Sequence, residues 1–371
     1  MPATPWLIVS KPLRPPFRDG STVLIRDLVR GLPEDRPVVY LGDPAHPLRP
    51  GGGVIDLPAM GYSPGLLAKV RVLAAMLHPR RRHLPVHLCF TPNPVTSRAV
   101  ALLRWLQPRR LLVQSLMSAH DAEQWVPLLR PLDAVVVLSR HTERRLAAAG
   151  VPAEKLHRIY PAVAAATPED PVKVAAQRRL LYAGDLDLDV AARLIAVGHA
   201  LAGPALAGWT LTIACRPKSE ADAAARDALR IGLAPQLAAG RVSLLAEVAD
   251  MDALQRSASL QLYAADHVRR KVDLPLVLLE GLARGVPAVV VDADPVRELL
   301  QVGRDHGLVA GAAAPAEPVA FARAVAEICR PDAIAGASAA AAVLAGREFS
   351  LAAMVRCYGA LYAALEGARA G

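Results

Sequence analysis

The stretch that decides the fold is Lys271–Leu300, KVDLPLVLLEGLARGVPAVVVDADPVRELL. Pro275 stands where a helix can begin without a backbone N–H, apolar residues then recur at helical spacing, and Gly285 suits a left-handed C-terminal cap. These signals predict a helix over residues 275–284. The run Ala288–Val291 that follows is uniformly apolar and rich in β-branched residues, which predicts a parallel strand covered on both faces.

Glu280 interrupts the apolar pattern of this helix. A helix that lies against a sheet buries most of its side chains, and a carboxylate without a partner is costly to bury. The side chain therefore needs a partner, and a ligand hydroxyl is one candidate.

Residues 274–299, LPLVLLEGLARGVPAVVVDADPVREL, resemble the C-terminal-domain signature of family 4 glycosyltransferases, which have the GT-B fold. That signature has a leading Glu, a helix with a second Glu eight positions later, Gly-x-Pro, a buried strand and a loop ending in Glu-Leu. The resemblance implies that Glu280 binds the ribose of a nucleotide and that Glu298 lies at the donor site. The leading Glu is absent, because Val272 occupies its position.

The length and composition allow two ordinary domains, each with its own core. The chain has 371 residues, of which 53% are hydrophobic and only 4% aromatic, so we expect aliphatic cores. The formal net charge is +9, and residues 1–170 account for it with 22 Lys or Arg against 13 Asp or Glu. A positive surface restricted to one half indicates an anionic partner there, either membrane lipid or a phosphorylated molecule.

Cysteine usage and the N-terminus favour a cytoplasmic protein in a reducing compartment. The four cysteines are far apart, lie in apolar contexts and form no C-x-x-C pair: Cys89, Cys215, Cys329 and Cys357. No apolar run reaches the length of a membrane span, and MPATPWLIVSKPLRPP lacks the basic start of a signal peptide. We therefore expect no signal peptide and no spanning helix.

Strands and helices alternate through the first half of the chain, which predicts a parallel, doubly wound sheet. The expected strands are residues 6–10, 37–42, 86–92, 111–116 and 134–139. Gly20 lies at the start of the first helix, where the backbone can approach a ligand closely and the N–H groups of the next turn can receive an anion. A plain helix cap explains the same residues.

His120 follows an apolar strand at its carboxyl end, where doubly wound folds place their ligands. The family resemblance implies that a His at this place faces the donor sugar, and that Gly20 corresponds to a glycine-rich loop near the donor phosphates. A structural histidine is the alternative. Residues 134–163, AVVVLSRHTERRLAAAGVPAEKLHRIYPAV, also follow the family pattern of strand, Ser, helix, Gly-Val, Lys and strand.

Two stretches of the first half combine apolar and basic residues. Residues 65–79, GLLAKVRVLAAMLHP, are amphipathic and precede three consecutive arginines, and residues 102–110, LLRWLQPRR, contain Trp105. Such stretches can lie on an anionic bilayer, and core-facing helices with solvated basic ends are the alternative. Nucleic-acid binding is not favoured, because the basic stretches lack interleaved aromatic residues and a recognisable motif.

The second half predicts another doubly wound sheet, with strands at residues 180–184, 209–215, 241–247, 260–265 and 288–291. The polar, proline-bearing stretch 164–172 is the expected linker. Residues 349–365 resemble the terminal helix of the family, which crosses back onto the first domain. We therefore expect an α/β protein of two Rossmann-like domains facing across a cleft: 1–165 for the acceptor, 166–348 for the nucleotide sugar, and 349–371 packing back on the first domain.

The family transfers a sugar from a nucleotide-diphosphate sugar with retention of configuration and usually without a metal, so we expect a nucleotide sugar as co-substrate and no cofactor. Negative charge develops on the leaving diphosphate, which calls for cations or helix N-termini. Family members carry Arg directly after the Gly of the first C-domain strand and Lys a few residues later. Here Gly184 is followed by Asp185, Leu186, Asp187, Leu188 and Asp189.

Cations in other loops are candidates to replace the missing pair. Arg216 and Lys218 follow one expected strand, and Arg269, Arg270 and Lys271 precede the Glu280 helix. Lys271 and His120 are our candidate catalytic residues. Solvated charged loops are the alternative for all five cations.

Two classes of function remain open from the sequence. The first is a retaining glycosyltransferase that acts on a lipid-linked or small-molecule acceptor and associates with an anionic membrane surface. The second is a catalytically inactive GT-B protein that serves as a binding or regulatory partner. Glu280 favours the first class, since a scaffold without a nucleotide has little need for a carboxylate in that helix.

Overall fold

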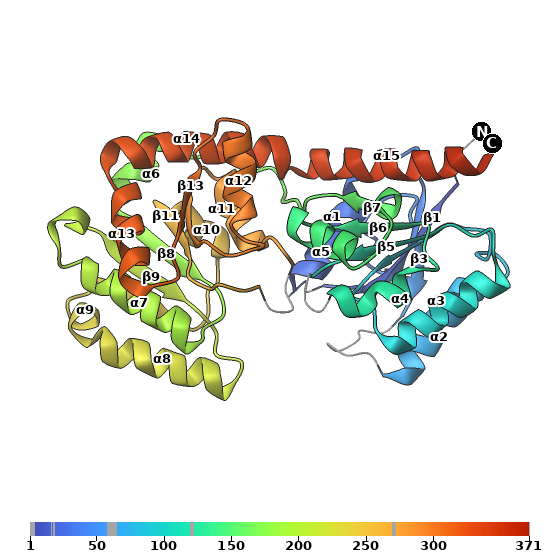
Figure 1. Ribbon diagram of the computed structural model, residues 1–371, viewed down its shortest axis with the longest axis horizontal. Helices are drawn as coiled ribbons and strands as arrows, with labels where there is room; N and C mark the ends of the chain where they lie inside the picture. The colour runs from blue at the N-terminus through green and yellow to red at the C-terminus, as the bar shows by residue number, and fades with distance from the viewer. Residues whose placement is uncertain are drawn as a thin grey trace. The chain divides into compact units, whose positions relative to one another are not determined.

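The chain divides into two compact units in a computed structural model that describes residues 4–15, 17, 19–57, 65–118, 122–268 and 272–370 (Figure 1). Unit 1 holds the described residues of Met1–Ala162, Arg269–Asp273 and Leu351–Gly371, and unit 2 those of Val163–Val268 and Leu274–Ser350. Each unit has its own parallel sheet, so the expected pair of Rossmann-like domains is confirmed.

Unit 1 is built on seven parallel strands in the order β3-β2-β1-β4-β5-β6-β7. Strands β4, β5 and β6 are buried along their whole length, as expected for a sheet covered on both faces. The strands are β1 (Trp6–Leu13), β2 (Val38–Gly42), β3 (Gly53–Asp56), β4 (Val86–Cys89), β5 (Leu112–Leu116), β6 (Ala134–Val137) and β7 (Leu156–Arg158).

Helices cover both faces of this sheet. One core joins the sheet to α1 and α15 through side chains such as Leu28 and Met354, and the other joins it to α2, α3 and α4 through Met76, Leu103 and Leu129. The helices of unit 1 are α1 (Gly20–Gly31), α2 (Leu66–Leu77), α3 (Pro94–Leu106), α4 (Val126–Leu129), α5 (Arg140–Ala148) and α15 (Leu351–Ala370).

The C-terminal helix α15 is joined to the sheet of unit 1 by a buried polar network. Tyr362 Oη lies 2.6 Å from His87 Nδ1, and Ser115 Oγ lies 2.7 Å from His87 Nε2 and 3.0 Å from Tyr358 Oη. Complete burial lowers the pKa of His87 to about 3, so the ring is neutral. The expected return of the C-terminal helix to the first domain is thereby confirmed.

Apolar and charged contacts extend this attachment to the end of α15. The rings of Tyr362 and Trp6 stack with their centroids 4.0 Å apart. Trp6 Nε1 donates to Glu366 Oε1 at 2.7 Å, and Arg36 forms an ion pair with the same carboxylate at 3.1 Å.

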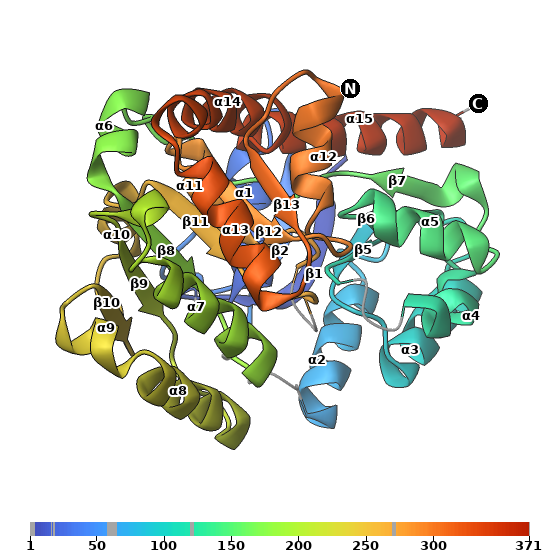
Figure 2. The same ribbon diagram turned by 60° about the vertical axis from the view of Figure 1, so that its left-hand side comes forward.

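Unit 2 is built on six parallel strands in the order β10-β9-β8-β11-β12-β13. They are β8 (Arg179–Ala183), β9 (Thr210–Ala214), β10 (Val242–Leu245), β11 (Leu260–Tyr263), β12 (Ala288–Val291) and β13 (Gly311–Ala314). The helices, shown from a second side in Figure 2, are α6 (Pro171–Gln177), α7 (Leu188–Ala200), α8 (Glu220–Gly232), α9 (Ala234–Ala238), α10 (Met251–Arg256), α11 (Leu276–Ala283), α12 (Glu298–Asp305), α13 (Pro318–Ile328) and α14 (Pro331–Glu348).

The deciding stretch forms α11 and β12 as predicted. Pro275 caps the start of α11, and Gly285 follows its end with a φ of +81°, a left-handed conformation that glycine adopts without strain. Gly281 lets the helix lie close to the sheet, since a Cβ there would meet the side chain of Gln261 at about 2 Å. Strand β12 is fully buried between β11 and β13.

Two strands and one helix boundary differ from expectation. Strand β3 is a short, largely exposed edge strand with the sequence GVID, so its apolar run is only two residues long. Strand β13 is GAAA and has none of the β-branched residues that indicate a strand. The C-terminal helix begins at Leu351 rather than at residue 349, because Phe349 ends α14 and Ser350 pairs with Val163 in an isolated bridge.

No single helix in the described part of the chain is long and apolar enough to span a membrane. Taken together, α13 and α14 have the length and composition of a membrane span, but the chain bends by 87° at their junction. Phe321 of α13 and Leu344 of α14 are fully buried, which makes this pair weak evidence for a span.

Candidate functional site

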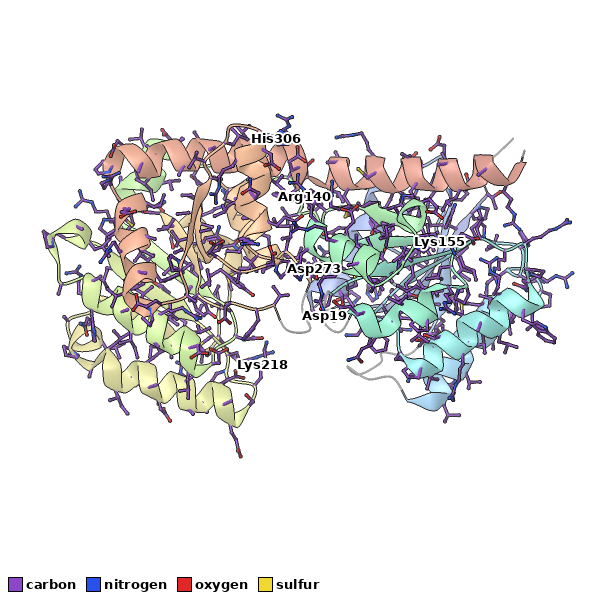
Figure 3. All side chains as sticks on the ribbon, viewed as in Figure 1. Asp19, Arg140, Lys155, Lys218, Asp273 and His306 are labelled. Carbon is purple, nitrogen blue, oxygen red and sulfur yellow. The ribbon has the colours of Figure 1, made fainter. Side chains whose placement is uncertain are left out.

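Charged side chains from three strand ends of unit 2 meet in pairs. Lys218, after β9, forms an ion pair with Asp185, after β8, with Nζ 2.7 Å from Oδ1 (Figure 3). Both side chains are partly exposed, so the pair adds little to stability. Its consequence is electrostatic, because the carboxylate offsets the positive charge that Lys218 would offer to an anion.

Asp187 has a local structural role. Its Oδ1 accepts from Val190 N at 2.8 Å and caps α7, while its Oδ2 lies 3.1 Å from His267 Nε2 in the loop after β11. Asp189 is exposed. The expected acidic run thus divides into one ion-paired residue, one helix cap and one solvated residue.

Arg193 is a buried cation that the sequence analysis missed. It lies on α7 with 5% of its surface exposed. Its guanidinium donates to the carbonyls of Ala316 at 2.6 Å and Ala264 at 2.8 Å, and to Asp266 Oδ2 at 3.2 Å. It therefore joins α7 to the loops after β13 and β11. Its place in the apolar stripe of α7, three residues after Val190, was the available signal.

Gly184 lies in a tightly built turn after β8. Its N–H donates to Ala214 O at 3.2 Å, and a Cβ at this position would meet Tyr182 Oη at 3.0 Å. The Tyr182 hydroxyl donates to the carbonyl of Asp185, and burial raises the pKa of this phenol well above its ordinary value. The turn is thus held by backbone and phenol contacts.

Arg216 is an exposed cation after β9. We find no hydrogen bond or ion pair of its guanidinium with any residue that the structure describes. Two positions later, Lys218 is engaged by Asp185. Arg216 is therefore the better-placed cation of this loop to receive an anionic ligand.

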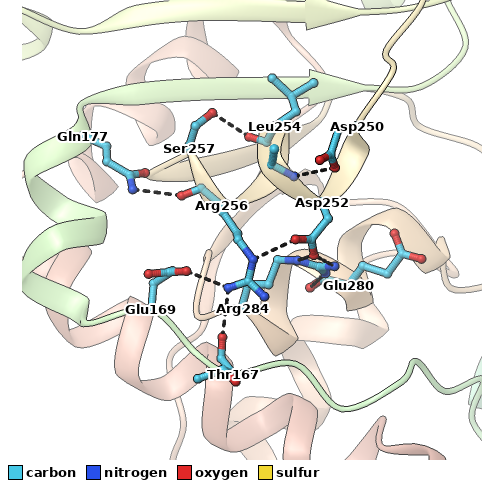
Figure 4. Close-up of polar contacts among 11 residues, drawn as sticks. Thr167, Glu169, Gln177, Asp250, Asp252, Leu254, Arg256, Ser257, Glu280 and Arg284 are labelled. Atoms are coloured by element: carbon cyan, nitrogen blue, oxygen red, sulfur yellow. Dashed lines mark hydrogen bonds and ion pairs between the residues drawn. The ribbon is translucent and has the colours of Figure 1, made fainter.

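Glu280 lies on α11 and is partly buried, so its burial costs less than the sequence suggested. Arg284 Nη1 donates to the Glu280 carbonyl at 2.6 Å. In Figure 4 the Glu280 side chain points away from Arg284 and Asp252. The Glu280 carboxylate therefore takes no part in the ion pair between Arg284 and Asp252.

An ionic network fixes the C-terminal end of α11 (Figure 4). Asp252 accepts from Arg256 Nε and from Arg284 Nε, each at 2.8 Å. These hydrogen bonds hold the pKa of the Asp252 carboxyl below its ordinary value. Arg256 also pairs with Glu169 at 2.6 Å, and Glu169 N donates to Arg284 O at 2.9 Å, so the chain before α6 is tied to α11.

Glu298 is the first residue of α12 and is buried, with 4% of its surface exposed. Its N–H donates to Pro295 O at 3.1 Å. The neighbouring Arg297 is exposed and pairs with Asp294 at 2.8 Å. Glu298 thus lies on the segment that follows β12.

The residue at the position of the missing leading Glu, and the residue after it, contribute to the packing of unit 1. Val272 is buried in a core of unit 1. The next residue, Asp273, is fully buried and accepts from Ser139 Oγ at 2.7 Å and Thr142 Oγ1 at 2.5 Å, at the start of α5 (Figure 3). The nearest carboxylate therefore serves to attach the chain to α5.

Gly20 begins α1 in unit 1, and Asp19 caps that helix. Asp19 Oδ1 accepts from Thr22 N at 3.0 Å and from Ser21 Oγ at 2.6 Å, and Lys11 Nζ lies 3.6 Å from Oδ2. Burial acts to raise the pKa of Asp19, but these hydrogen bonds and Lys11 outweigh it and lower the pKa. Asp19 therefore acts as a helix cap, which was the alternative to anion binding at this place. Its carboxylate repels an anion at the start of α1.

Several candidates lie outside the described residues, namely His120, Arg269, Arg270 and Lys271. Among the residues that are described, no group of three or more His, Cys, Asp or Glu side chains is arranged to hold a metal ion.

The topology of unit 2 brings most of the expected donor-site residues onto adjacent segments. Gly184, Arg216 and Glu298 follow β8, β9 and β12, and Glu280 lies on the helix between β11 and β12. The order β9-β8-β11-β12 makes these strands neighbours. Parallel sheets of this kind place ligands beyond the carboxyl ends of their strands.

Comparisons with known proteins agree with this geometry. Residues 177–330 match the family described as glycosyl transferases group 1. A search of curated proteins gave no match. The matched segment runs from the end of α6 to the end of α13 and so includes all the donor-site candidates of unit 2 that the structure describes.

Solved structures resemble nearly the whole chain. Anabaena HepE, solved in complex with UDP and glucose, shares 16% identity at a TM-score of 0.69, covering 97% of this chain and 100% of that chain. A glycosyltransferase from Rickettsia africae shares 13% identity at 0.69, covering 98% and 99%. A UDP-forming trehalose-phosphate synthase from Burkholderia xenovorans shares 11% identity at 0.68, covering 98% and 100%. These likenesses confirm the GT-B fold.

Proposed function

Because residues 177–330 match the family described as glycosyl transferases group 1, we propose that the chain transfers a sugar from a UDP-sugar to an acceptor with retention of anomeric configuration. The observation that carries the proposal is the coincidence of the family match with the donor-site candidates of unit 2. UDP is favoured because similar folds were solved with UDP and with UDP-glucose.

Each donor-site residue has a chemical role in this proposal. Glu280 accepts hydrogen bonds from the ribose hydroxyls, since a carboxylate is a strong acceptor. Arg216 stabilises the negative charge that develops on the diphosphate. Lys218 also stabilises this charge when its ion pair with Asp185 is broken. Gly184 lets the backbone approach the donor, and Glu298 supports the loop after β12.

Several further assignments belong to the same proposal. His120 and Lys271 act at the reacting sugar, with Arg269 and Arg270 near the phosphates. The domain formed by residues 1–165 binds a lipid-linked or small-molecule acceptor, and the reaction uses no metal. The four cysteines are free, which supports a cytoplasmic protein in a reducing compartment.

A thermal-shift panel of nucleotides tests donor binding. UDP or UDP-glucose should raise the melting temperature, because a ligand at a hundredfold excess over Kd stabilises the native state by roughly 2.7 kcal/mol. ADP, GDP and free uridine should shift it less. Glu280→Ala should remove most of the shift while the fold is retained, and Glu327→Gln, on the exposed surface of α13, is the control.

A catalytically inactive binding protein is the second candidate. The observations that favour it are the Asp185 carboxylate beside Lys218 and the apolar Val272 at the leading Glu position. If no nucleotide shifts the melting curve at millimolar concentration, this second candidate replaces the first. UDP release from UDP-glucose by wild type but not by Glu280→Ala would exclude it.

A further inference from the structure

The outer sides of α2 and α3 form one surface of unit 1. Both helices pack on the same face of the sheet, since Met76 of α2 and Leu103 of α3 belong to one core. The two helices also contact each other and run side by side in both views (Figures 1 and 2). The α2–α3 surface consists of Leu67, Val70, Arg71, Arg98, Leu102, Trp105 and Leu106.

The apolar side chains of this surface are unusually exposed. Leu67 is 78% exposed and Trp105 is 76% exposed. Every large hydrophobic side chain that the structure describes as exposed in unit 1 lies on α2 or α3. Concentration on two adjacent helices, rather than scattering, is typical of a binding surface.

The charged residues of the sequence stretch that contains these helices have one sign. Residues 57–120 contain nine Lys or Arg and no Asp or Glu, which equals the formal net charge of the whole protein. Arg110 donates to backbone carbonyls, and Arg104 does so too while pairing with Asp133 at 2.7 Å. Arg71, Arg98 and Arg109 are exposed, and their side chains have no hydrogen bond or ion pair with the described residues.

We propose that the α2–α3 surface docks on an anionic lipid bilayer. Apolar side chains enter the headgroup region and arginines contact lipid phosphates, as in helices that lie in a membrane interface. Trp105 suits this boundary, because its ring is apolar and its indole N–H is polar. Because α2 and α3 carry no Asp or Glu, these helices themselves do not repel an anionic surface.

A bilayer fits this surface better than a nucleic acid. Single-stranded nucleic acids bind where aromatic side chains alternate with cations and stack on successive bases. The α2–α3 surface offers one aromatic ring, Trp105, and several aliphatic side chains that cannot stack on a base. This inference does not depend on the donor site, so vesicle binding without nucleotide tests it separately from sugar transfer.

Vesicle flotation of the full chain provides the test. The protein should float with vesicles of equal parts phosphatidylcholine and phosphatidylglycerol at low salt, and should remain behind with pure phosphatidylcholine. Raising the ionic strength should weaken binding, because exposed charges are screened over about 8 to 10 Å. Failure to float with anionic vesicles at low salt would overturn the proposal.

Matched variants locate the binding surface. Arg71→Gln and Arg98→Gln should each weaken the partition coefficient about fivefold, since a cation near an anionic bilayer contributes about 1 kcal/mol. Leu67→Ser combined with Trp105→Ser should weaken it by at least about tenfold. The control variants Arg323→Gln and Ile231→Ser change exposed residues of unit 2 and should bind as wild type does.

Fluorescence quenching tests insertion directly. Trp6 and Trp209 are buried and Trp125 is partly buried, so brominated lipid should quench mainly Trp105. Trp105→Phe keeps an aromatic ring but removes the indole, so it should still float with anionic vesicles and should lose most of the tryptophan quenching. That result supports insertion at this position. Equal loss of binding in the control variants, or tight binding to single-stranded RNA without binding to anionic vesicles, would contradict it.

Discussion

In the proposed donor site, Asp185 determines how much positive charge a diphosphate would meet after β8 and β9. The family resemblance led us to expect an Arg and a Lys near this place, and here an acidic residue engages Lys218 at 2.7 Å. Because the pair is partly exposed, water and salt screen it, and a strongly charged ligand can compete for the ammonium group. Arg216 lacks such a partner among the described residues, so in the proposed site it would contact the diphosphate before Lys218 does.

Asp185→Asn should strengthen UDP binding. The change removes a negative charge beside the phosphates and releases Lys218, which together should lower the Kd about threefold to tenfold at low salt. Lys218→Ala in the same background should reverse the gain. A Kd that is unchanged or higher in Asp185→Asn would show that the diphosphate does not lie near this loop.

Local sequence signals predicted some of these residues and missed others. Glu280 and Gly285 were recognised because a charge in an apolar helix and a glycine after it are local patterns. The pairing of Lys218 with Asp185 joins positions 33 residues apart, and only the folded sheet brings them together. Asp273 could not be assigned either, since its hydroxyl partners lie more than a hundred residues earlier.

At the scale of elements, α15 is attached to unit 1 by specific buried contacts. Its Tyr358 and Tyr362 reach His87 and Ser115 inside the sheet of unit 1, and all four side chains are buried. A buried network in which each member has a partner fixes the register of the helix, because sliding would leave polar groups unsatisfied.

Tyr362→Phe should lower the free energy of unfolding by about 1 to 3 kcal/mol, because it leaves His87 Nδ1 buried without its partner. Tyr358→Phe should cost less, since Ser115 keeps its contact with His87. Urea unfolding of the two variants checks the order. Negligible effects in both variants would mean that ring packing, which Phe retains, rather than the hydrogen bonds, determines the attachment.

The same histidine predicts a pH dependence of stability. The pKa of His87 is about 3 in the folded protein and 6.5 in the unfolded chain. Below pH 6.5 the unfolded state binds a proton that the folded state does not, so stability falls by up to about 1.4 kcal/mol per pH unit until the pH approaches 3.

His87→Gln isolates this contribution to the pH dependence. Plotted against pH below 6.5, the free energy of unfolding of wild type should fall more steeply than that of the variant. Parallel curves would show that His87 is protonated in the native state.

At the scale of the whole molecule, alternation of strands and helices was enough to predict two doubly wound sheets. Uniform apolar strands such as β6 and β12 were recognised, because burial on both faces leaves a clear pattern. The alanine-rich β13 was not, since its place is set by pairing with β12 rather than by its own residues. The α2–α3 surface was visible as amphipathic sequence, and its exposure required the structure.

The central claim is that unit 2 binds a uridine nucleotide through Glu280. Isothermal titration of UDP into the full chain, with wild type, Glu280→Gln and Glu327→Gln compared at one salt concentration, tests it most directly. We expect one site per chain in wild type and in Glu327→Gln, and a Kd at least about tenfold higher in Glu280→Gln, as for a lost hydrogen bond to a charged group. No heat of binding at millimolar UDP, or the same Kd in all three proteins, would contradict the claim.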